Sequence, residues 1–197
     1  MENYVNNPRN CINMKEKLSR LHRLFQLKEI ERAGKVLNRM ESSAEHTWST
    51  MILAEYFLKI MDHDLDELKV LKLILYHDVV EIEAGDFKIL ERPENKKELE
   101  LKAFEKLKTQ IPSILADEYS LLFDEYENAT SKEAEFAKAI DVLEPMIHWL
   151  NDKEAWKTTG FTEENLRKHK QKYLEKFPSL LDFFNQMIEY LKQEDFI

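Results

Sequence analysis

The sequence predicts an all-α fold, arranged as a single compact helical bundle, and three observations lead to this prediction. The chain of 197 residues contains only three glycines and five prolines, so few residues interrupt regular structure. Residues with high helix propensity, namely Leu, Lys, Glu, Ala and Met, dominate the composition. Apolar residues recur with helical spacing, and the breaks fall at helix-capping patterns. A chain of this length, 43% of it hydrophobic, is expected to form one domain over residues 1–197.

The N-terminal part of the chain predicts two helices joined by a linker. Apolar positions at helical spacing predict a first helix over about 11–28, and a linker containing Gly34 follows it. Ser42 and Glu45 have the spacing of a capping box, in which each side chain bonds the backbone N–H of the other residue. A second helix is therefore expected over about 43–60.

A third helix is predicted to carry a His–Asp pair. Asp64 and Glu67 repeat the capping-box spacing, and the apolar run behind them continues to His77 and Asp78. Gly85 is expected to end this helix, because glycine readily adopts the backbone conformation that follows a helix C-terminus.

The rest of the chain predicts a loop at about 86–94 and then further helices. The first of them are charged, and two C-terminal helices are expected to pack on a core formed by residues about 25–150. No internal repeat or low-complexity tract is found. The predicted helices cover about 96–109, 112–127, 131–151, 162–175 and 179–193.

Composition also restricts the partners. A net charge of −9 argues against a nucleic-acid polymer or an anionic membrane as the main partner, since both require a broad basic surface. Cys11 is the only cysteine, so an intrachain disulfide and a thiolate zinc cluster are excluded. The N-terminus does not have the pattern of a signal peptide, and no apolar run reaches the roughly 18 residues of a membrane span. A cytoplasmic location is expected.

A cluster of imidazoles and carboxylates is the most informative feature of the sequence. His77, Asp78 and Glu81 occupy positions i, i+1 and i+4 of one predicted helix. His46 lies in the first turn of the second helix, and Asp141 lies in a mostly apolar stretch of a later one. Because buried charge is costly unless it is paired or bound to a metal, two imidazoles and two carboxylates from this cluster are candidate metal ligands.

The residue types indicate which metals would suit the site. Two imidazoles and two carboxylates favour one divalent transition metal, Mn, Fe, Co, Ni or Zn, over Mg or Ca, which prefer oxygen ligands only. A second His–Asp pair, His63–Asp64, lies in a polar stretch between helices and is better explained by helix capping.

The order of these residues resembles the HD-domain phosphohydrolase superfamily and, within it, the 5′-deoxynucleotidase group. The resemblance covers most of the chain. Its matching stretches are ERAGKVLNRMESSAEH, LYHDVVEIEAGD and LLFDEYENATSKEAEFAKAIDVLE.

The resemblance implies a role for each residue of the set. It assigns the divalent metal to His46, His77, Asp78 and Asp141. Glu81 and Asp86 would act beside the metal on water and substrate, and Arg32 would contact the substrate phosphate. Ala33 stands where the bacterial enzymes of this group tend to have an aromatic residue against the sugar, so selectivity for deoxyribose over ribose does not follow from the resemblance.

The function that follows is metal-dependent hydrolysis of (deoxy)nucleoside 5′-monophosphates, and two alternatives stay open. One is hydrolysis of another phosphoester or phosphoanhydride, such as an alarmone or a deoxynucleoside triphosphate. The alarmone enzymes resemble HDxxED, whereas Ile82 follows the glutamate here, and a longer phosphate chain needs more cationic residues than the motifs identify. The other alternative is a non-catalytic helical binding protein on the same scaffold, although no residue of the set is lost.

Further expectations concern the neighbouring residues and assembly. The relatives suggest a homodimer, for which Phe183, Phe184 and Ile188 would supply exposed apolar surface. Glu83 is expected to face solvent, and Glu144 is expected either to line the pocket or to form a salt bridge. The remaining histidines and the three tryptophans are expected to be surface or core residues: His22, His148, His169, Trp48, Trp149 and Trp156.

Overall fold

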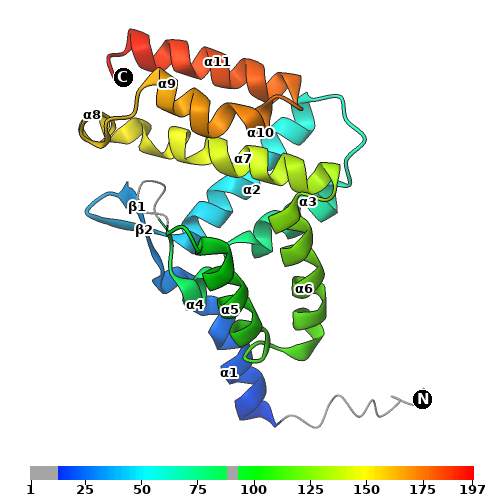
Figure 1. The fold of residues 1–197 in the computed structure, drawn as a ribbon. Helices are drawn as coiled ribbons and strands as arrows, with labels where there is room; N and C mark the ends of the chain where they lie inside the picture. Colours follow the sequence, from blue (N-terminus) through cyan, green and yellow to red (C-terminus); the bar gives the residue numbers. More distant parts are fainter. Residues whose placement is uncertain (1–12, 88–92) are drawn as a thin grey trace.

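The computed structural model describes residues 13–87 and 93–197 of the chain. Cys11, and the parts of the predicted first helix and of the 86–94 loop beyond these ranges, lie outside the described residues. The predicted all-α class is confirmed, because helices form most of the described structure and the strands form a single two-stranded sheet (Figure 1).

The first predicted helix is present, but the predicted linker forms a hairpin. Helix α1 (Met14–Phe25) is capped by Asn13 and continues into a 3-10 turn, η2 (Gln26–Glu29). Strands β1 (Glu31–Val36) and β2 (Arg39–Ser42) then pair antiparallel. Leu37, in the turn between them, has a φ of 56°, a conformation that costs energy for a residue with a Cβ. The linker prediction was wrong because this short, polar segment has no strong strand periodicity.

Helix α2 (Ser43–Ile60) begins where the capping box predicts. The Ser42 hydroxyl accepts from the Glu45 N–H at 3.3 Å, and the Glu45 carboxylate accepts from the Ser42 N–H at 2.9 Å. The guanidinium of Arg39 also bonds the Glu45 carboxylate, from β2. The start of the helix that carries His46 is therefore attached to the hairpin.

Helix α3 (Glu67–His77) is shorter than predicted. Asp66, not Asp64, caps it, accepting from the Lys69 N–H at 3.0 Å; the polar stretch offers several aspartates, and spacing alone does not choose among them. The helix ends at His77, and after a turn the short helix α4 (Glu81–Ala84) follows up to Gly85, whose φ is 74°. The predicted continuous helix was wrong, because the chain changes direction at Asp78.

The later helices lie close to their predicted ranges, and the C-terminal region is more broken than predicted. The unpredicted α8 follows the 3-10 turn η4, and a π-helical stretch, η5, interrupts the predicted 162–175 helix. The bounds are α5 (Lys96–Lys108), α6 (Ser113–Asn128), α7 (Lys132–His148), η4 (Trp149–Asn151), α8 (Lys153–Thr159), α9 (Glu163–Leu166), η5 (Arg167–Gln171), α10 (Lys172–Leu174) and α11 (Pro178–Gln193).

Helix α7 is the centre of the bundle. It packs against α2, α3 and α6 and also against α10 and α11. In Figure 1 it crosses the middle of the molecule, with α11 beyond the α9–α10 segment on one side and α2 and α3 on the other. Because it lies between these layers, a side chain on α7 can meet residues from distant parts of the sequence.

Two expectations about apolar surface were wrong. Phe184 and Ile188 are fully buried and Phe183 packs against the core, so they do not supply an exposed dimer surface. Trp48, expected in the core, is 65% exposed. It begins an exposed row on α2, spaced one helical turn apart, that continues with Ile52, Tyr56 and Ile60. Among the described residues, no helix is both long enough and apolar enough to cross a membrane.

Ser42→Ala is expected to destabilise the protein by about 1 kcal/mol, the usual cost of losing a helix N-cap. Chemical denaturation would measure the free energy of unfolding. Ser19→Ala is the matched control, because Ser19 is exposed within α1 and caps nothing. Equal stability of the two variants would show that the capping box does not stabilise the start of α2.

Candidate metal centre

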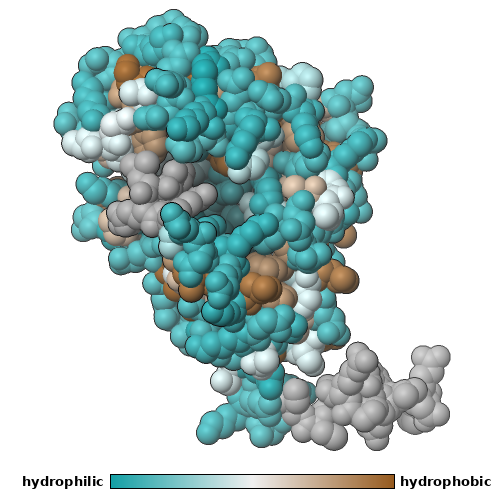
Figure 2. Space-filling model, in the orientation of Figure 1, coloured by the Kyte–Doolittle hydropathy of each residue, from teal (hydrophilic) through white to brown (hydrophobic). Residues whose placement is uncertain are grey.

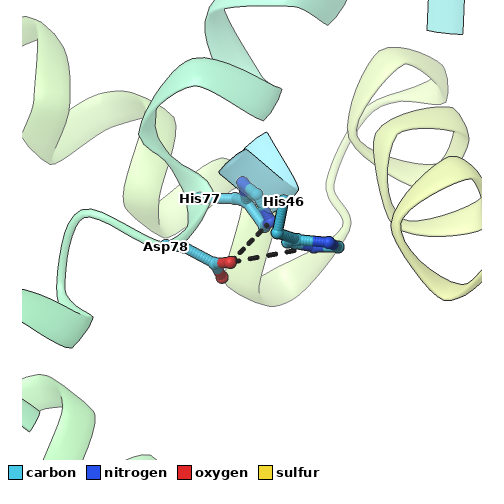
Figure 3. Close-up of side chains that lie close together, drawn as sticks. All are labelled: His46, His77 and Asp78. Atoms are coloured by element: carbon cyan, nitrogen blue, oxygen red, sulfur yellow. Dashed lines mark ion pairs between the residues drawn. The ribbon is translucent and has the colours of Figure 1, made fainter. Parts of the chain in front are cut away.

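The four predicted metal ligands come together in the structure. His46 extends from α2, His77 and Asp78 lie at the end of α3, and Asp141 extends from α7. His46 Nε2 lies 2.9 Å from Asp141 Oδ1 and 3.8 Å from Asp78 Oδ2, while His77 Nε2 lies 3.1 Å from Asp78 Oδ2 and 3.7 Å from Asp141 Oδ1. Figure 3 shows His46, His77 and Asp78 directed toward one another.

Hydrogen bonds on the far side of each ring orient the two imidazoles. His77 Nδ1–H donates to the carbonyl of Ile74 at 2.6 Å, and His46 Nδ1–H donates to Glu144 Oε2 at 2.6 Å. The Nε2 atoms therefore face the two aspartates. His77 Nε2 is buried and has no hydrogen-bond partner among the described residues. Metal-binding histidines are held in this way in proteins, so the donor set fits a divalent metal.

The ionisation of this cluster is strongly perturbed. Burial lowers the pKa of His46, but hydrogen bonds to Asp141 and Glu144 raise it to about 9. Burial opposes ionisation of Asp78, yet the charge of His77 lowers the pKa of Asp78 to about 2. The pKa of Asp141 is also held well below its ordinary value, against burial, by both imidazoles. The positive charge of the protonated imidazoles thus balances the negative charge of the two aspartates. A bound metal ion would replace those protons.

Arg32, Glu81 and Asp86 lie beside this cluster. Arg32 Nη1 is 3.0 Å from Asp78 Oδ2, 3.6 Å from Glu81 Oε1 and 3.5 Å from Asp86 Oδ1. The Ser43 hydroxyl donates to Glu81 Oε2 at 2.5 Å. The hairpin brings Arg32 to the site, and the turn after α3 brings the two acids. All seven residues singled out from the sequence are therefore close together.

Glu81 is the acid with the most unusual ionisation in this group. Burial and the charge of Asp78 raise the pKa of Glu81 to about 8, although Arg32 and the Ser43 hydroxyl act in the opposite direction. Burial alone would lower the pKa of Arg32, but the surrounding carboxylates raise it. Arg32 is therefore a fixed cation, whereas Glu81 can exchange a proton near neutral pH.

A second layer of buried polar groups lies behind His46. Glu144 accepts from His46, and the Glu41 carboxylate lies 3.2 Å from His148 Nδ1. Burial and the charge of Glu144 raise the pKa of Glu41 to about 7. A Cβ at Gly34 would lie 2.5 Å from His148 Nε2, so only glycine allows the hairpin to pack this closely.

Glu41 was not identified from the sequence. It directly precedes the capping serine in a polar stretch, and nothing in its spacing indicates burial. Glu144 forms a salt bridge with His46 at 2.6 Å, which is one of its two predicted roles. His148 is a mostly buried histidine, as expected.

Two openings meet at the cluster. The apolar cavity, of about 360 Å³, is lined by aromatic and aliphatic residues that include Trp149, Trp156 and Phe161. The polar cleft, of about 420 Å³, exposes His77, Asp78 and Glu81. Both openings share Arg32, Asp86, Phe87, Asp141, Val142 and Lys170. The cluster therefore lies between an apolar and a polar compartment.

Other charged residues have structural partners. Glu83 does not face solvent as expected: only 6% of its side chain is exposed, and it pairs with Arg23 and with Lys106. His63 bonds backbone atoms of Leu58 and Leu65. Asp64, 77% exposed, pairs with Lys132 at 2.7 Å. The second His–Asp pair is thus separate from the metal-type cluster, as we call His46, His77, Asp78 and Asp141. Asp64 does not cap a helix, so the predicted capping role of this pair was wrong.

The comparison with protein families matches the HD domain over residues 24–181. The chain belongs to the HD domain family. The human 5′-deoxynucleotidase HDDC2 is 31% identical over 127 residues, which cover 62% of this chain and 61% of the human protein. The 5′-deoxynucleotidase hdd1 of Schizosaccharomyces pombe is 33% identical over 130 residues, which cover 61% of this chain and 64% of the yeast protein.

A solved structure supports the same relationship. The crystal structure of a predicted metal-dependent phosphohydrolase from Magnetospirillum magnetotacticum has a TM-score of 0.79 and 28% sequence identity, covering 93% of this chain and 95% of the other. The HD domain phosphohydrolases imply a divalent metal, and this chain has the histidine and aspartate groups to hold one.

We expect the protein to retain about one divalent transition metal per chain, and Asp141→Ala to lose it while remaining folded, because a carboxylate ligand is removed. Elemental analysis with circular dichroism would test this, with exposed Asp182→Ala as the matched control. Tight stoichiometric metal in folded Asp141→Ala would refute the ligand assignment.

Metal affinity should fall as the pH falls below about 9, since protons then occupy His46.

Proposed function

We propose that this HD domain protein is a metal-dependent 5′-nucleotidase that releases phosphate from (deoxy)nucleoside 5′-monophosphates. The observation that carries the proposal is the position of the metal-type cluster between the apolar cavity and the polar cleft. Such a substrate has an apolar, aromatic end and a phosphate dianion, and these match the two compartments. The curated relatives named 5′-deoxynucleotidases support the same activity.

The ligands in this proposal are His46, His77, Asp78 and Asp141. A divalent metal held by them would supply a more acidic water and neutralise phosphate charge. Glu81 takes the proton of the attacking water, since its carboxylate lies next to Asp78 and titrates near neutral pH. Asp86 orients Arg32 and the sugar side of the substrate, because it lines both compartments.

Arg32 binds the phosphate. Its guanidinium lies among Asp78, Glu81 and Asp86, at the border of both compartments, where a planar fork can grip two phosphate oxygens. Ala33 lines the apolar cavity next to it. With no aromatic ring at this position, the nucleoside would meet the aromatic side chains of Trp149, Trp156 and Phe161, which line the same cavity.

The alternatives find less support. Ile82 is buried beside Glu81, so the second acid of the alarmone enzymes is replaced by a core residue. A non-catalytic scaffold does not need the acids beside the ligands, yet Glu81, Asp86 and Arg32 are all held at the cluster.

Assembly and location remain part of the proposal. A homodimer, a cytoplasmic location and the absence of a nucleic-acid or membrane partner are predictions from the sequence. If the homodimer forms, the exposed row on α2 that begins with Trp48 offers a more suitable surface than the buried C-terminal residues. Light scattering would give its mass in solution, and a monomer would contradict it.

Glu81→Gln should keep the metal and lose most turnover of a nucleotide such as dAMP, because an amide cannot accept the proton. A fall in kcat of about 10²- to 10⁴-fold is expected from the usual contribution of acid–base catalysis. Steady-state kinetics would measure it, with Glu83→Gln as the matched control, since Glu83 lines neither compartment. Unchanged kcat would transfer the role to Asp86.

Arg32→Ala should raise KM for dAMP and lower kcat/KM while metal content stays the same. Arg32→Lys should recover only part, because an ammonium lacks the planar fork. The matched control is Arg39→Ala, which removes a guanidinium that faces Glu45 outside both compartments. A wild-type kcat/KM in both Arg32 variants would show that the phosphate is bound by other residues. Failure of the wild type to hydrolyse any nucleoside monophosphate would refute the proposed nucleotidase activity.

A further inference from the structure

Helix α1 is attached to the bundle mainly through two arginines, and it leaves a row of apolar residues in solvent. Arg20 donates to the carbonyls of Thr109 at 3.0 Å and Ile111 at 2.9 Å. Arg23 donates to the side chain of Gln110 at 2.6 Å. None of the residues of α1 is buried. Four apolar residues on the side away from these contacts form the α1 seam, as we call them, and are each 41–67% exposed: Met14, Leu18, Leu21 and Phe25.

The packing of the chain does not explain the α1 seam. In Figure 1, α1 projects from the end of the bundle opposite α11. The face of the molecule shown in Figure 2 is mainly hydrophilic, so a continuous apolar row contrasts with it. An amphipathic helix normally turns its apolar stripe toward a neighbour, and contiguous exposed apolar residues mark interaction sites. The seam therefore indicates an interaction surface.

The spacing of the α1 seam indicates that its partner is a helix. The four residues follow one another at intervals of four, three and four positions, which is the pattern of a coiled-coil seam. A strict seam of this kind is narrower than the apolar stripe of a helix that packs on a broad apolar surface. A single helix with its own apolar seam thus fits it better than a bilayer does.

Cationic side chains flank the α1 seam on both sides. In the helix, Lys15 and His22 lie along one side of the seam, and Lys17 lies along the other. Lys28, just after α1, lies over the ring of Phe25. All four cationic residues are exposed, and within the described part of the chain the three lysines form no ion pair.

These charges favour an acidic partner. The only acidic residue of α1, Glu16, pairs with Arg20 at 3.1 Å on the side that faces the bundle, so it does not offset the lysines. Charges beside a coiled-coil seam determine which helices pair. Two copies of α1 would bring their lysines together, which is unfavourable. A helix with carboxylates beside its seam would instead form ion pairs with them.

From this geometry we propose that the α1 seam binds an acidic amphipathic helix of another protein, in a short two-helix packing of the coiled-coil type. The bundle already holds α1 in place, so little ordering of this helix is required on binding. The inference goes beyond the proposed function and does not depend on it, because no residue of the seam lines the apolar cavity or the polar cleft.

Two synthetic helical peptides test the α1 seam. Both have about three heptads with leucine at the seam positions, and the flanking positions are glutamate in one peptide and lysine in the other. Fluorescence anisotropy with the full chain at physiological ionic strength should show saturable binding of the glutamate peptide. Binding of the lysine peptide should be at least about tenfold weaker, because like charges would face each other. A general attraction to this chain, whose net charge is −9, would give the opposite preference.

Two double variants separate the apolar contact from the charges. Leu18→Ala/Leu21→Ala should bind the glutamate peptide about 100-fold more weakly, the effect of two lost apolar contacts of ordinary size. Lys15→Glu/Lys17→Glu should prefer the lysine peptide to the glutamate peptide. Circular dichroism should show the wild-type helix content in both variants, since all four side chains are exposed.

The matched control is Leu101→Ala/Leu121→Ala, which removes two exposed leucines from α5 and α6. It should bind the glutamate peptide like the wild type. Equal affinity of the wild type for both peptides, or an unchanged affinity in the Leu18/Leu21 variant, would overturn the proposal.

Two further measurements test other occupants of the α1 seam. A lower mass in light scattering for the Leu18/Leu21 variant than for the wild type would assign the seam to a second copy of this chain. Cosedimentation of the wild type, but not of that variant, with vesicles of phosphatidylcholine and phosphatidylserine would assign it to a membrane surface. Either result would overturn the acidic helix, and the expected result is equal mass and no cosedimentation.

Discussion

The concentration of buried charge where α2, α3 and α7 meet is the constraint on which the rest of the structure depends. Each charge in such a place is costly unless another charge, a hydrogen bond or a metal compensates it. The compensation comes from all parts of the chain: Arg32 from the hairpin, Tyr126 from α6 donating to Asp141 at 3.0 Å, and Glu144 behind His46. The helices of the bundle therefore pack around a polar centre, and not around a uniformly hydrophobic core.

The hairpin shows how this constraint acts on the backbone. It interrupts an otherwise helical chain, yet it places Arg32 at the cluster and Glu41 beside His148. Gly34 lets the strand approach the His148 ring more closely than a residue with a Cβ would allow. The change of direction after His77 acts similarly, because it turns Glu81 toward Ser43. Both departures from regular helix occur where the site needs a side chain.

The same two places explain which parts of the structure could be predicted. Periodicity and caps located most helices, and the spacing of His77, Asp78 and Glu81 singled out the site, since these signals are local in sequence. The hairpin, the end of α3 and the buried Glu41 depend on tertiary contacts, which outweigh local propensity. Burial of Phe184 and exposure of Trp48 were misjudged for the same reason: a single helix does not reveal which face its neighbours cover.

Charge segregation connects the fold with the proposed chemistry. An anionic chain repels a phosphate ester at long range, and screening weakens this repulsion beyond about 10 Å at ordinary ionic strength. Within that distance the local arrangement of charges decides, and here five lysines and Arg32 line the polar cleft together with six carboxylates. Their positive charge also offsets the acids that hold the metal-type cluster, so one opening can accept both a cation and an anion. The lysines are far apart in sequence, and the packing of α5, α7 and the C-terminal segment is what brings them to the same cleft.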